Sequence, residues 1–444
     1  MKRHLPFFFL LFSLASLLPA YGQTTTIWPW PWTQAEEYAY PFLPGGGWNT
    51  PGSFSPGSLA MGETYLTARN STAGFLNPAY LSYISAPQFS LSYRYTQNRY
   101  KTSSWGTLDL PAQAGSPETR TFRRETDFLD SAGLVLPFDD WVLAANYFLF
   151  QEYNFPEIRG PFWGYPVPLA QPEVWIGYPQ SVKQTGNMKG LNLAFSWRLT
   201  KAFSLGASAS YVFGDIDRVQ EMPDVYVIQA RRGPERMLPA SDPYPSTIQN
   251  SAYSAKGFFF NLGFTWAPNS QIVLGLSLRP PFSLDLQTEI ETMDSAGQRS
   301  YFSGDNYFKH PLVAVASVLF HPLEPFHFTL DLSYWGWGEF STDLDPGWFG
   351  NYDFKSVLKF NLGAEYDVRL PFDSVDTLVL RAGFIYDPQP YRYSPSIARD
   401  SLTFGFSLPV GRLDLQFAAK LGLSTQEKNR FHSAVLQAGA AYRF

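Results

Sequence analysis

Hydrophobic and polar residues alternate with a period of two along the last stretch of the chain, 433–444. One face carries Ala434, Leu436, Ala438, Ala440, Tyr442 and Phe444, and the other carries Ser433, Gln437, Gly439, Ala441 and Arg443, with Val435 as the single misfit. Successive side chains of a β-strand point to opposite faces of its sheet, so this pattern predicts a strand. Taken alone, the stretch could equally be an ordinary strand of a soluble sheet.

Strands of the same kind recur from residue 87 onward, separated by turn signals. We count fourteen, at 88–101, 121–136, 141–153, 189–199, 203–217, 253–267, 271–291, 307–320, 326–340, 354–370, 377–387, 399–408, 412–424 and 433–444. The connections after every second strand are short, and the intervening ones are mostly long, with 154–188 and 218–252 the longest. Short turns at one rim and long loops at the other indicate an all-β transmembrane antiparallel β-barrel.

The two faces of the strands differ in chemistry. In the tenth strand, Leu358, Phe360, Leu362, Ala364, Tyr366 and Val368 would face lipid, and Lys359, Asn361, Gly363, Glu365, Asp367 and Arg369 would face inward. We interpret the inward charges, which have both signs, as salt bridges that brace the lumen. Gly206, Gly263 and Gly383 are expected to mark bends or close approaches to a plug, and Pro280-Pro281 to bulge or bend the seventh strand.

The N-terminal end of the chain has the features of an export signal. A basic start, Lys2-Arg3-His4, precedes an apolar run over 5–18 and a small-x-small site at Ala20-Tyr21-Gly22. This order predicts a secretory signal peptide over residues 1–22, with an apolar run too short to span a membrane as a helix. The chain has no cysteine, which excludes disulfides, thiolate chemistry and lipid attachment at the cleavage site.

Composition agrees with a barrel. Aromatic residues make up 18% and charged residues 16% of the 444 residues, and the mean hydropathy is -0.17 because apolar residues are spread along the chain. A wall with lipid on one side and polar surroundings on the other requires this distribution. The net charge of -5 is too small to imply a charged partner, and no basic patch suits nucleic acid.

Residues 23–86 do not have the pattern of a barrel wall. They are rich in Trp, Pro and Gly, as in Trp28-Pro29-Trp30-Pro31-Trp32, and the stretch 59–71 could form at most one short helix. Their aromatic content argues against disorder, because segments that stay unfolded are usually poor in aromatic residues. We therefore interpret 23–86 as an N-terminal plug, or hatch, inside a barrel formed by residues 87–444.

Several short motifs resemble one family of barrels. The run Leu380-Arg381-Ala382-Gly383-Phe384-Ile385-Tyr386-Asp387, with Pro388, Pro390 and 399–405, resembles the late-barrel signature of the outer-membrane long-chain fatty acid and aromatic-hydrocarbon transporters of the FadL/TodX type. Ala60-Met61-Gly62, Ala68 and Asn77-Pro78-Ala79 are similar to that family's hatch motif, and Asp331 with Tyr334-Trp335 is similar to its mid-barrel strand.

The resemblance implies passive uptake of hydrophobic small molecules, long-chain fatty acids or hydrocarbons, by a monomer in the outer membrane of a diderm bacterium, without a cofactor. Ligand would pass from extracellular loops to a pocket beside the hatch, where Phe75 and Leu76 are possible lining residues. It would leave sideways through the wall at a bent third strand. That strand, 141–153, contains no glycine or proline to force a bend.

Two other expectations concern the ends of the pathway. Tyr153 and the aromatic residues of 154–188 would offer apolar area for capturing a greasy molecule, although aromatic side chains also suit the membrane interface. Tyr442 and the terminal Phe444 would be the signal that the barrel-assembly machinery recognises.

Two other functional classes are weighed against uptake. A barrel enzyme needs a histidine that activates a nucleophile or water, and beyond the signal peptide the only histidines are His310, His321, His327 and His432, where structural roles are the default. We therefore predict no enzymatic activity, and no His, Asp or Glu group has metal-ligand spacing. PorV-like barrels of the type 9 secretion system share an Asn-Pro-Ala motif but serve protein secretion or surface attachment, which requires exposed docking loops.

Overall fold

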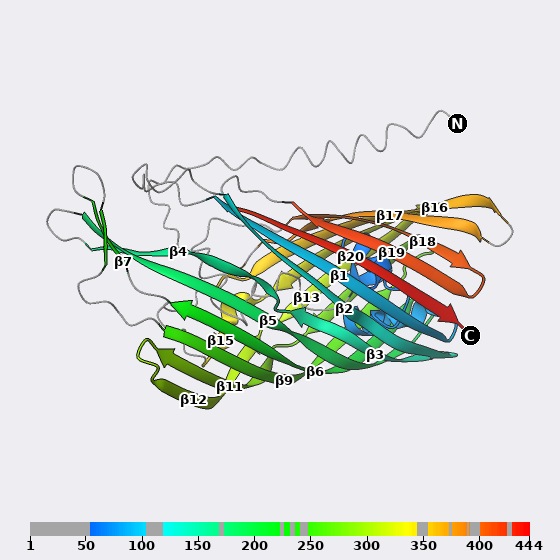
Figure 1. Ribbon diagram of the computed structural model, residues 1–444. Coiled ribbons are helices and arrows are strands. Elements are labelled where there is room, and N and C mark those ends of the chain that lie inside the picture. Colours follow the sequence, from blue (N-terminus) through cyan, green and yellow to red (C-terminus); the bar gives the residue numbers. More distant parts are fainter. Residues whose placement is uncertain are drawn as a thin grey trace.

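The computed structural model describes residues 54–103, 119–167, 173–222, 226–230, 236–239, 247–343, 354–372, 375–388, 390, 400–423 and 429–444. Twenty antiparallel strand segments join in one sheet (Figure 1). The sheet closes where β1 (Gln88–Ser103) pairs with β20 (Asn429–Arg443). The expected signal peptide and the leader before residue 54 lie outside the described residues.

These segments make the fourteen wall strands that the turn signals predicted. Eleven are single: β1, β2 (Thr119–Phe138), β3 (Trp141–Glu152), β5 (Glu173–Arg198), β6 (Phe203–Met222), β9 (Thr247–Trp266), β16 (Val357–Phe372), β17 (Val375–Tyr386), β18 (Ser401–Val410), β19 (Leu413–Gly422) and β20. Three are broken in two: β10 (Ile272–Arg279) with β11 (Phe282–Asp294), β12 (Arg299–His310) with β13 (Val313–Leu323), and β14 (Phe326–Trp335) with β15 (Ser341–Thr342).

The two long connections predicted from sequence differ from the structure. β4 (Phe155–Val167) pairs with an early start of β5, and β7 (Tyr226–Ala230) pairs with both β5 and β8 (Arg236–Pro239). Most of 154–188 is therefore strand rather than loop. The high proline and glycine content of this segment is typical of loops, so its sequence did not indicate strands.

The alternation in the wall strands agrees with the predicted faces. On β16, Leu358 and Tyr366 are exposed, whereas Glu365 between them is buried. On β20, Leu436 is exposed and its neighbour Val435 is buried, so the one misfit in the terminal pattern points into the lumen. The apolar side chains thus form the outer, lipid-facing surface of the barrel.

The described part of the hatch lies inside the barrel near the end with short turns (Figure 1). It consists of short helical turns: α3 (Pro56–Ala60), η1 (Tyr65–Thr67), α4 (Ala73–Leu76) and η2 (Pro78–Tyr83). The sequence predicted no more than one short helix over 59–71, and two of these turns fall at least partly within it. No helix in the described part of the chain is long and apolar enough to cross a membrane.

Removing Phe444 should slow barrel assembly far more than it weakens the finished barrel. The Phe444 side chain is 62% exposed, and its amide donates one hydrogen bond to the Pro87 carbonyl (3.0 Å). Little packing is therefore lost in the folded state. Pulse-labelled cells would show a delayed heat-modifiable band, while the melting temperature of purified barrel would barely change. Phe404→Ala, an exposed aromatic within β18, is the matched control and should assemble at the normal rate.

Candidate functional site

The hatch is held against the wall by glycines that leave room for its backbone. A Cβ at Gly206 of β6 would lie 2.3 Å from the Ala79 amide nitrogen, and one at Gly263 of β9 would lie 2.3 Å from Asn77 Oδ1. A Cβ at Gly383 of β17 would lie 2.3 Å from the Gly62 nitrogen. No side chain fits at these distances, which agrees with the prediction of close approaches to a plug.

The Asn-Pro-Ala turn is one of the anchors of the hatch. Asn77 is fully buried, its Oδ1 accepts a hydrogen bond from the Ala79 amide (3.1 Å), and η2 begins at Pro78. Asn77 Nδ2 donates to the wall carbonyls of Phe264 (3.4 Å) and Leu276 (3.3 Å). The motif therefore caps a helical turn and joins it to β9 and β10.

Three neighbouring wall strands are broken at the same level, on the long-loop side of the hatch. Pro280-Pro281 separates β10 from β11, as the sequence predicted, and Pro311 follows the end of β12. Proline cannot donate to a strand ladder, so pairing stops at these positions. The third break follows Trp335, where η3 (Trp337–Glu339) interrupts β14 and β15. The three breaks lie in register, since Arg279 pairs with Val313 and Val313 pairs with Trp335.

A cluster of buried aromatic rings lies in the lumen between these breaks and the hatch. The predicted residue Phe75 of α4 lies 4.5 Å, centroid to centroid, from Phe148 of β3 and 5.9 Å from Phe259 of β9. Phe282 packs on Phe259 at 4.7 Å and stacks on His310 at 4.7 Å, with ring planes only 4° apart. Leu76 is buried in the same apolar core. We refer to Phe75, Phe148, Phe150, Phe259, Phe282 and His310 as the aromatic cluster.

One cation, Arg279, lies at the edge of this cluster. It is only 5% exposed, and its guanidinium carbon is 5.5 Å from the ring centroids of both Phe259 and Trp335. Tyr65 of the hatch is close enough to interact with it electrostatically. Burial raises the pKa of Tyr65 to about 12, so the phenol stays protonated and provides no negative charge.

The third strand leaves the wall beside the cluster. The β2–β3 ladder ends at Ser131 and Phe148, beyond which 119–129 of β2 pair with β1 and β3 pairs with β5 alone. The seven side chains of 148–154, Tyr153 included, are all buried instead of alternating, so the strand turns into the lumen. Tyr153 therefore lies inside the barrel rather than on a capturing loop.

The bend arises although the strand itself contains no glycine or proline. β3 carries a register shift between Leu149 and Gln151. Gly190 on the neighbouring β5 provides the space, because a Cβ there would lie 2.4 Å from the ring of Phe148. The signal for the bend is therefore a glycine on the partner strand.

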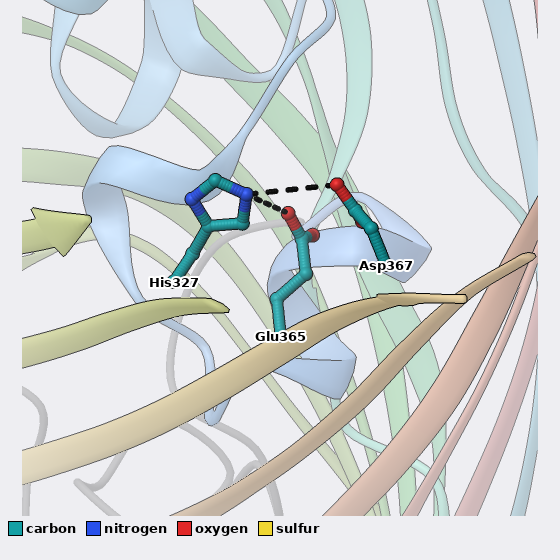
Figure 2. A group of neighbouring side chains, drawn as sticks. All are labelled: His327, Glu365 and Asp367. Atoms are coloured by element: carbon teal, nitrogen blue, oxygen red, sulfur yellow. Dashed lines mark ion pairs between the residues drawn. The ribbon is translucent and has the colours of Figure 1, made fainter. Parts of the chain in front are cut away.

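A network of charges lies at the short-turn end of the lumen (Figure 2). His327 of β14 is 3.8 Å from Glu365 and 3.7 Å from Asp367, both on β16. Such a trio could in principle hold a metal, and spacing along the chain did not reveal it because the residues come from two strands. Glu365, however, already pairs with Arg69 of the hatch (2.8 Å) and Arg381 (2.6 Å).

Two guanidinium groups on Glu365 disfavour a metal cation at this position, because like charges so close repel strongly in a partly buried site. We interpret the network as a brace between hatch and wall. Lys420 adds a second link of this kind, since its Nζ lies 2.7 Å from Glu63 Oε1 of the hatch. Both links agree with the expectation that inward charges pair with one another.

The sequence and the fold are similar to those of one family of proteins. The model of the family described as outer membrane protein transport protein (OMPP1/FadL/TodX) matches residues 174–399. A FadL homologue of Pseudomonas aeruginosa is similar in structure, with a TM-score of 0.63 and 15% identity over 90% of this chain and 100% of that one. The P. putida toluene transporter TodX has a TM-score of 0.60 and 16% identity over 88% of this chain and 99% of its own.

The Ralstonia pickettii toluene transporter TbuX is similar as well, with a TM-score of 0.56 and 14% identity over 88% of this chain and 98% of its own. At these identities the likeness shows a shared fold. No curated protein sequence matches the chain.

Proposed function

This chain belongs to the outer membrane protein transport family (OMPP1/FadL/TodX), whose model matches just over half of it, and from that membership we propose passive uptake of long-chain fatty acids or hydrocarbons across the outer membrane. The observation that carries the proposal is the buried aromatic cluster, which lies between the hatch and the point where β3 leaves the wall. Aromatic rings bind an apolar ligand favourably because the contact removes apolar surface of both the rings and the ligand from water.

The wall supports a sideways exit for the ligand. Backbone groups in a membrane wall must pair with neighbouring strands, and the β2–β3 ladder stops at Ser131 and Phe148. Phe148 belongs to the aromatic cluster and also marks the end of that ladder. A ligand leaving the cluster beside β3 would therefore reach lipid without displacing the hatch, whose contacts with Gly206, Gly263 and Gly383 hold it in place.

The alternative, a PorV-like barrel for protein secretion or surface attachment, is less well supported. A protein-binding barrel needs exposed docking loops, and its function does not require an apolar lumen. The lumen of this barrel holds six clustered rings, among them the hatch residue Phe75, which suits a small hydrophobic ligand.

Adjacent residues of β9 allow a matched test. Phe259 is 1% exposed in the aromatic cluster, whereas Phe258 is 64% exposed on the lipid face. In host cells that lack their own channel of this kind, Phe259→Ala should reduce uptake of radiolabelled palmitate or toluene at low concentration by about tenfold, since a lost ring contact costs on the order of 1 kcal/mol or more. Phe258→Ala should leave uptake near normal. Equal uptake by cells with and without the wild-type barrel would contradict the proposal.

A further inference from the structure

Strand β2 contains a β-bulge at the point where its ladder with β3 ends. The β1–β2 register shifts between Ser92 and Tyr93, where Asp130 is the extra residue of β2. The next residue, Ser131, forms with Phe148 the last pair of the β2–β3 ladder. A bulge disrupts a ladder locally and bends its strand. The bulge therefore marks one edge of the sideways opening.

Buried partners hold the bulge in place. Asp130 is fully buried and forms an ion pair with Arg94 of β1 (2.8 Å), and Gln437 of β20 donates a hydrogen bond to its carboxylate (2.7 Å). Breaking a buried ion pair leaves an uncompensated charge and is strongly unfavourable. The bulge is therefore a fixed feature of the wall.

The bulge changes the register in which β3 can pair further along β2. Before it, the even-numbered residues of 123–129 are the less exposed ones, and after it the odd-numbered residues of 131–135 are. Side chains of directly opposite residues in a sheet point to the same face. A regularly alternating β3 can therefore continue its ladder only if the bulge residue is left out of the pairing.

The side chains of the bent strand already lie in that register. Counting along both strands from the last pair, with the bulge residue omitted, Thr126 falls opposite Glu152. In the same register Arg124 falls opposite Asn154. The Thr126 hydroxyl donates to the Glu152 carboxylate, and Arg124 Nη2 donates to Asn154 Oδ1 (3.4 Å). These contacts cross the gap where the backbone ladder is missing.

The edge of β2 beside this gap favours closure. Residues 119–129 pair with β1 on one side and form no ladder with β3 on the other. Backbone groups in a membrane wall that lack a strand partner are unfavourable. Pairing with β3 would satisfy these groups.

We propose that β3 has a second position, in which 149–154 pair with 124–129 of β2 around the bulge at Asp130, and that this position closes the sideways exit. The inference rests on the proposed function and concerns its regulation. The contacts of Thr126 with Glu152 and of Arg124 with Asn154 guide β3 into the closed register. Asp130 is a positioning residue, because the ladder opens as far as the bulge and stays paired beyond it.

A disulfide can trap the closed position, because the chain has no cysteine of its own. In the proposed register Asp127 lies opposite Gln151, and opposite residues have Cβ atoms about 5 Å apart, close to disulfide geometry. In the bent strand Gln151 is 5% exposed and accepts a hydrogen bond from Tyr153 (2.9 Å), whereas Asp127 is exposed on the outer face. Oxidation of the purified Asp127→Cys/Gln151→Cys barrel in lipid nanodiscs with copper phenanthroline should therefore form a disulfide through the closed position.

The same double variant connects closure to transport. In cells, oxidation should reduce its uptake of radiolabelled palmitate by about tenfold or more, and a reductant should restore it, because the disulfide holds β3 closed. Arg123→Cys/Gln151→Cys is the matched control, since it keeps one cysteine and moves the other four residues along the same face of β2. The control should form no disulfide and keep its uptake after oxidation.

Deletion of Asp130 tests the bulge without a new covalent bond. It makes β2 alternate regularly, so the ladder with β3 can extend without interruption. Arg94 keeps a counter-charge nearby, since Glu152 is close enough to interact with it electrostatically. Amide hydrogen exchange in 122–129 should slow and uptake should fall. Unchanged exchange and normal uptake would contradict the role of the bulge.

Three results would overturn the inference. The first is no disulfide in Asp127→Cys/Gln151→Cys after prolonged oxidation, and the second is equal cross-linking of the control variant. The third is a disulfide that leaves uptake unchanged. The disulfide forms without any ligand, so the inference can fail while wild-type barrel still takes up palmitate. Equal uptake by cells with and without the wild-type barrel would instead contradict the proposed function.

Discussion

Deleting the described hatch, residues 54–86, should leave a folded barrel that conducts ions and polar solutes freely. The wall closes through its own hydrogen bonds, from β1 to β20, and needs no contribution from the hatch. The hatch, by contrast, fills the lumen through contacts with Gly206, Gly263 and Gly383. In planar bilayers, conductance should rise from nearly zero to that of an open pore, and the purified protein should remain heat-modifiable.

Asn77→Ala should weaken the attachment of the hatch to the wall without removing the hatch. It removes the amide that joins the hatch to the Phe264 and Leu276 carbonyls but keeps the hatch in the chain. Brief openings rather than a permanent pore are expected, because a lost cap and two lost hydrogen bonds cost only about 1–3 kcal/mol. If the deletion blocked membrane insertion and conductance never rose, residues 54–86 would be part of the folding core rather than a plug.

The wall of the barrel could be predicted from sequence because its physics is local. Each strand has lipid on one side and the lumen on the other, so Leu358 and Tyr366 must alternate with Glu365 whatever lies elsewhere. Glycines at Gly206 and Gly263 could be identified as contact points for the same reason, since a missing side chain in a lumen-facing position needs an explanation. Fourteen strands and a plugged lumen follow from such local signals.

The candidate site depends instead on which strands are neighbours. Arg279 is one inward cation among several in the sequence, and only the structure shows that Lys359 has a partner whereas Arg279 has none among the described residues. His327 reaches Glu365 through the register of β14 and β16, which spacing along the chain does not encode. The bend of β3 depends on Gly190 of β5, so the residues of β3 alone do not indicate it.

Gly190→Ala should close the sideways route. The added Cβ would lie 2.4 Å from the Phe148 ring, so the ring could no longer pack inward at this position. Overpacking of this kind costs about 1–3 kcal/mol, and we expect β3 to relieve it by straightening and extending its ladder with β2. Uptake should fall by about tenfold or more, because an energy penalty of this size on the bent state of β3 lowers the population of that state by a similar factor.

Two measurements separate a closed exit from a damaged barrel. Amide hydrogen exchange in 122–129 of β2, which pair only with β1 in the structure, should slow as new β2–β3 hydrogen bonds form. Binding of palmitate to the purified barrel in lipid nanodiscs should persist, because Gly190→Ala changes no residue of the aromatic cluster. Adding Phe148→Ala to Gly190→Ala removes the clashing ring and should restore much of the uptake.

Gly336→Ala is the matched control for this prediction. Its Cβ would meet nothing closer than 3.5 Å, an ordinary contact, so uptake should stay near the wild-type rate. Wild-type uptake and unchanged exchange in Gly190→Ala would show that the bend of β3 does not depend on this glycine. Slowed exchange with normal uptake would be the more serious result, because it would mean that ligand leaves the aromatic cluster by another path than the opening between β2 and β3.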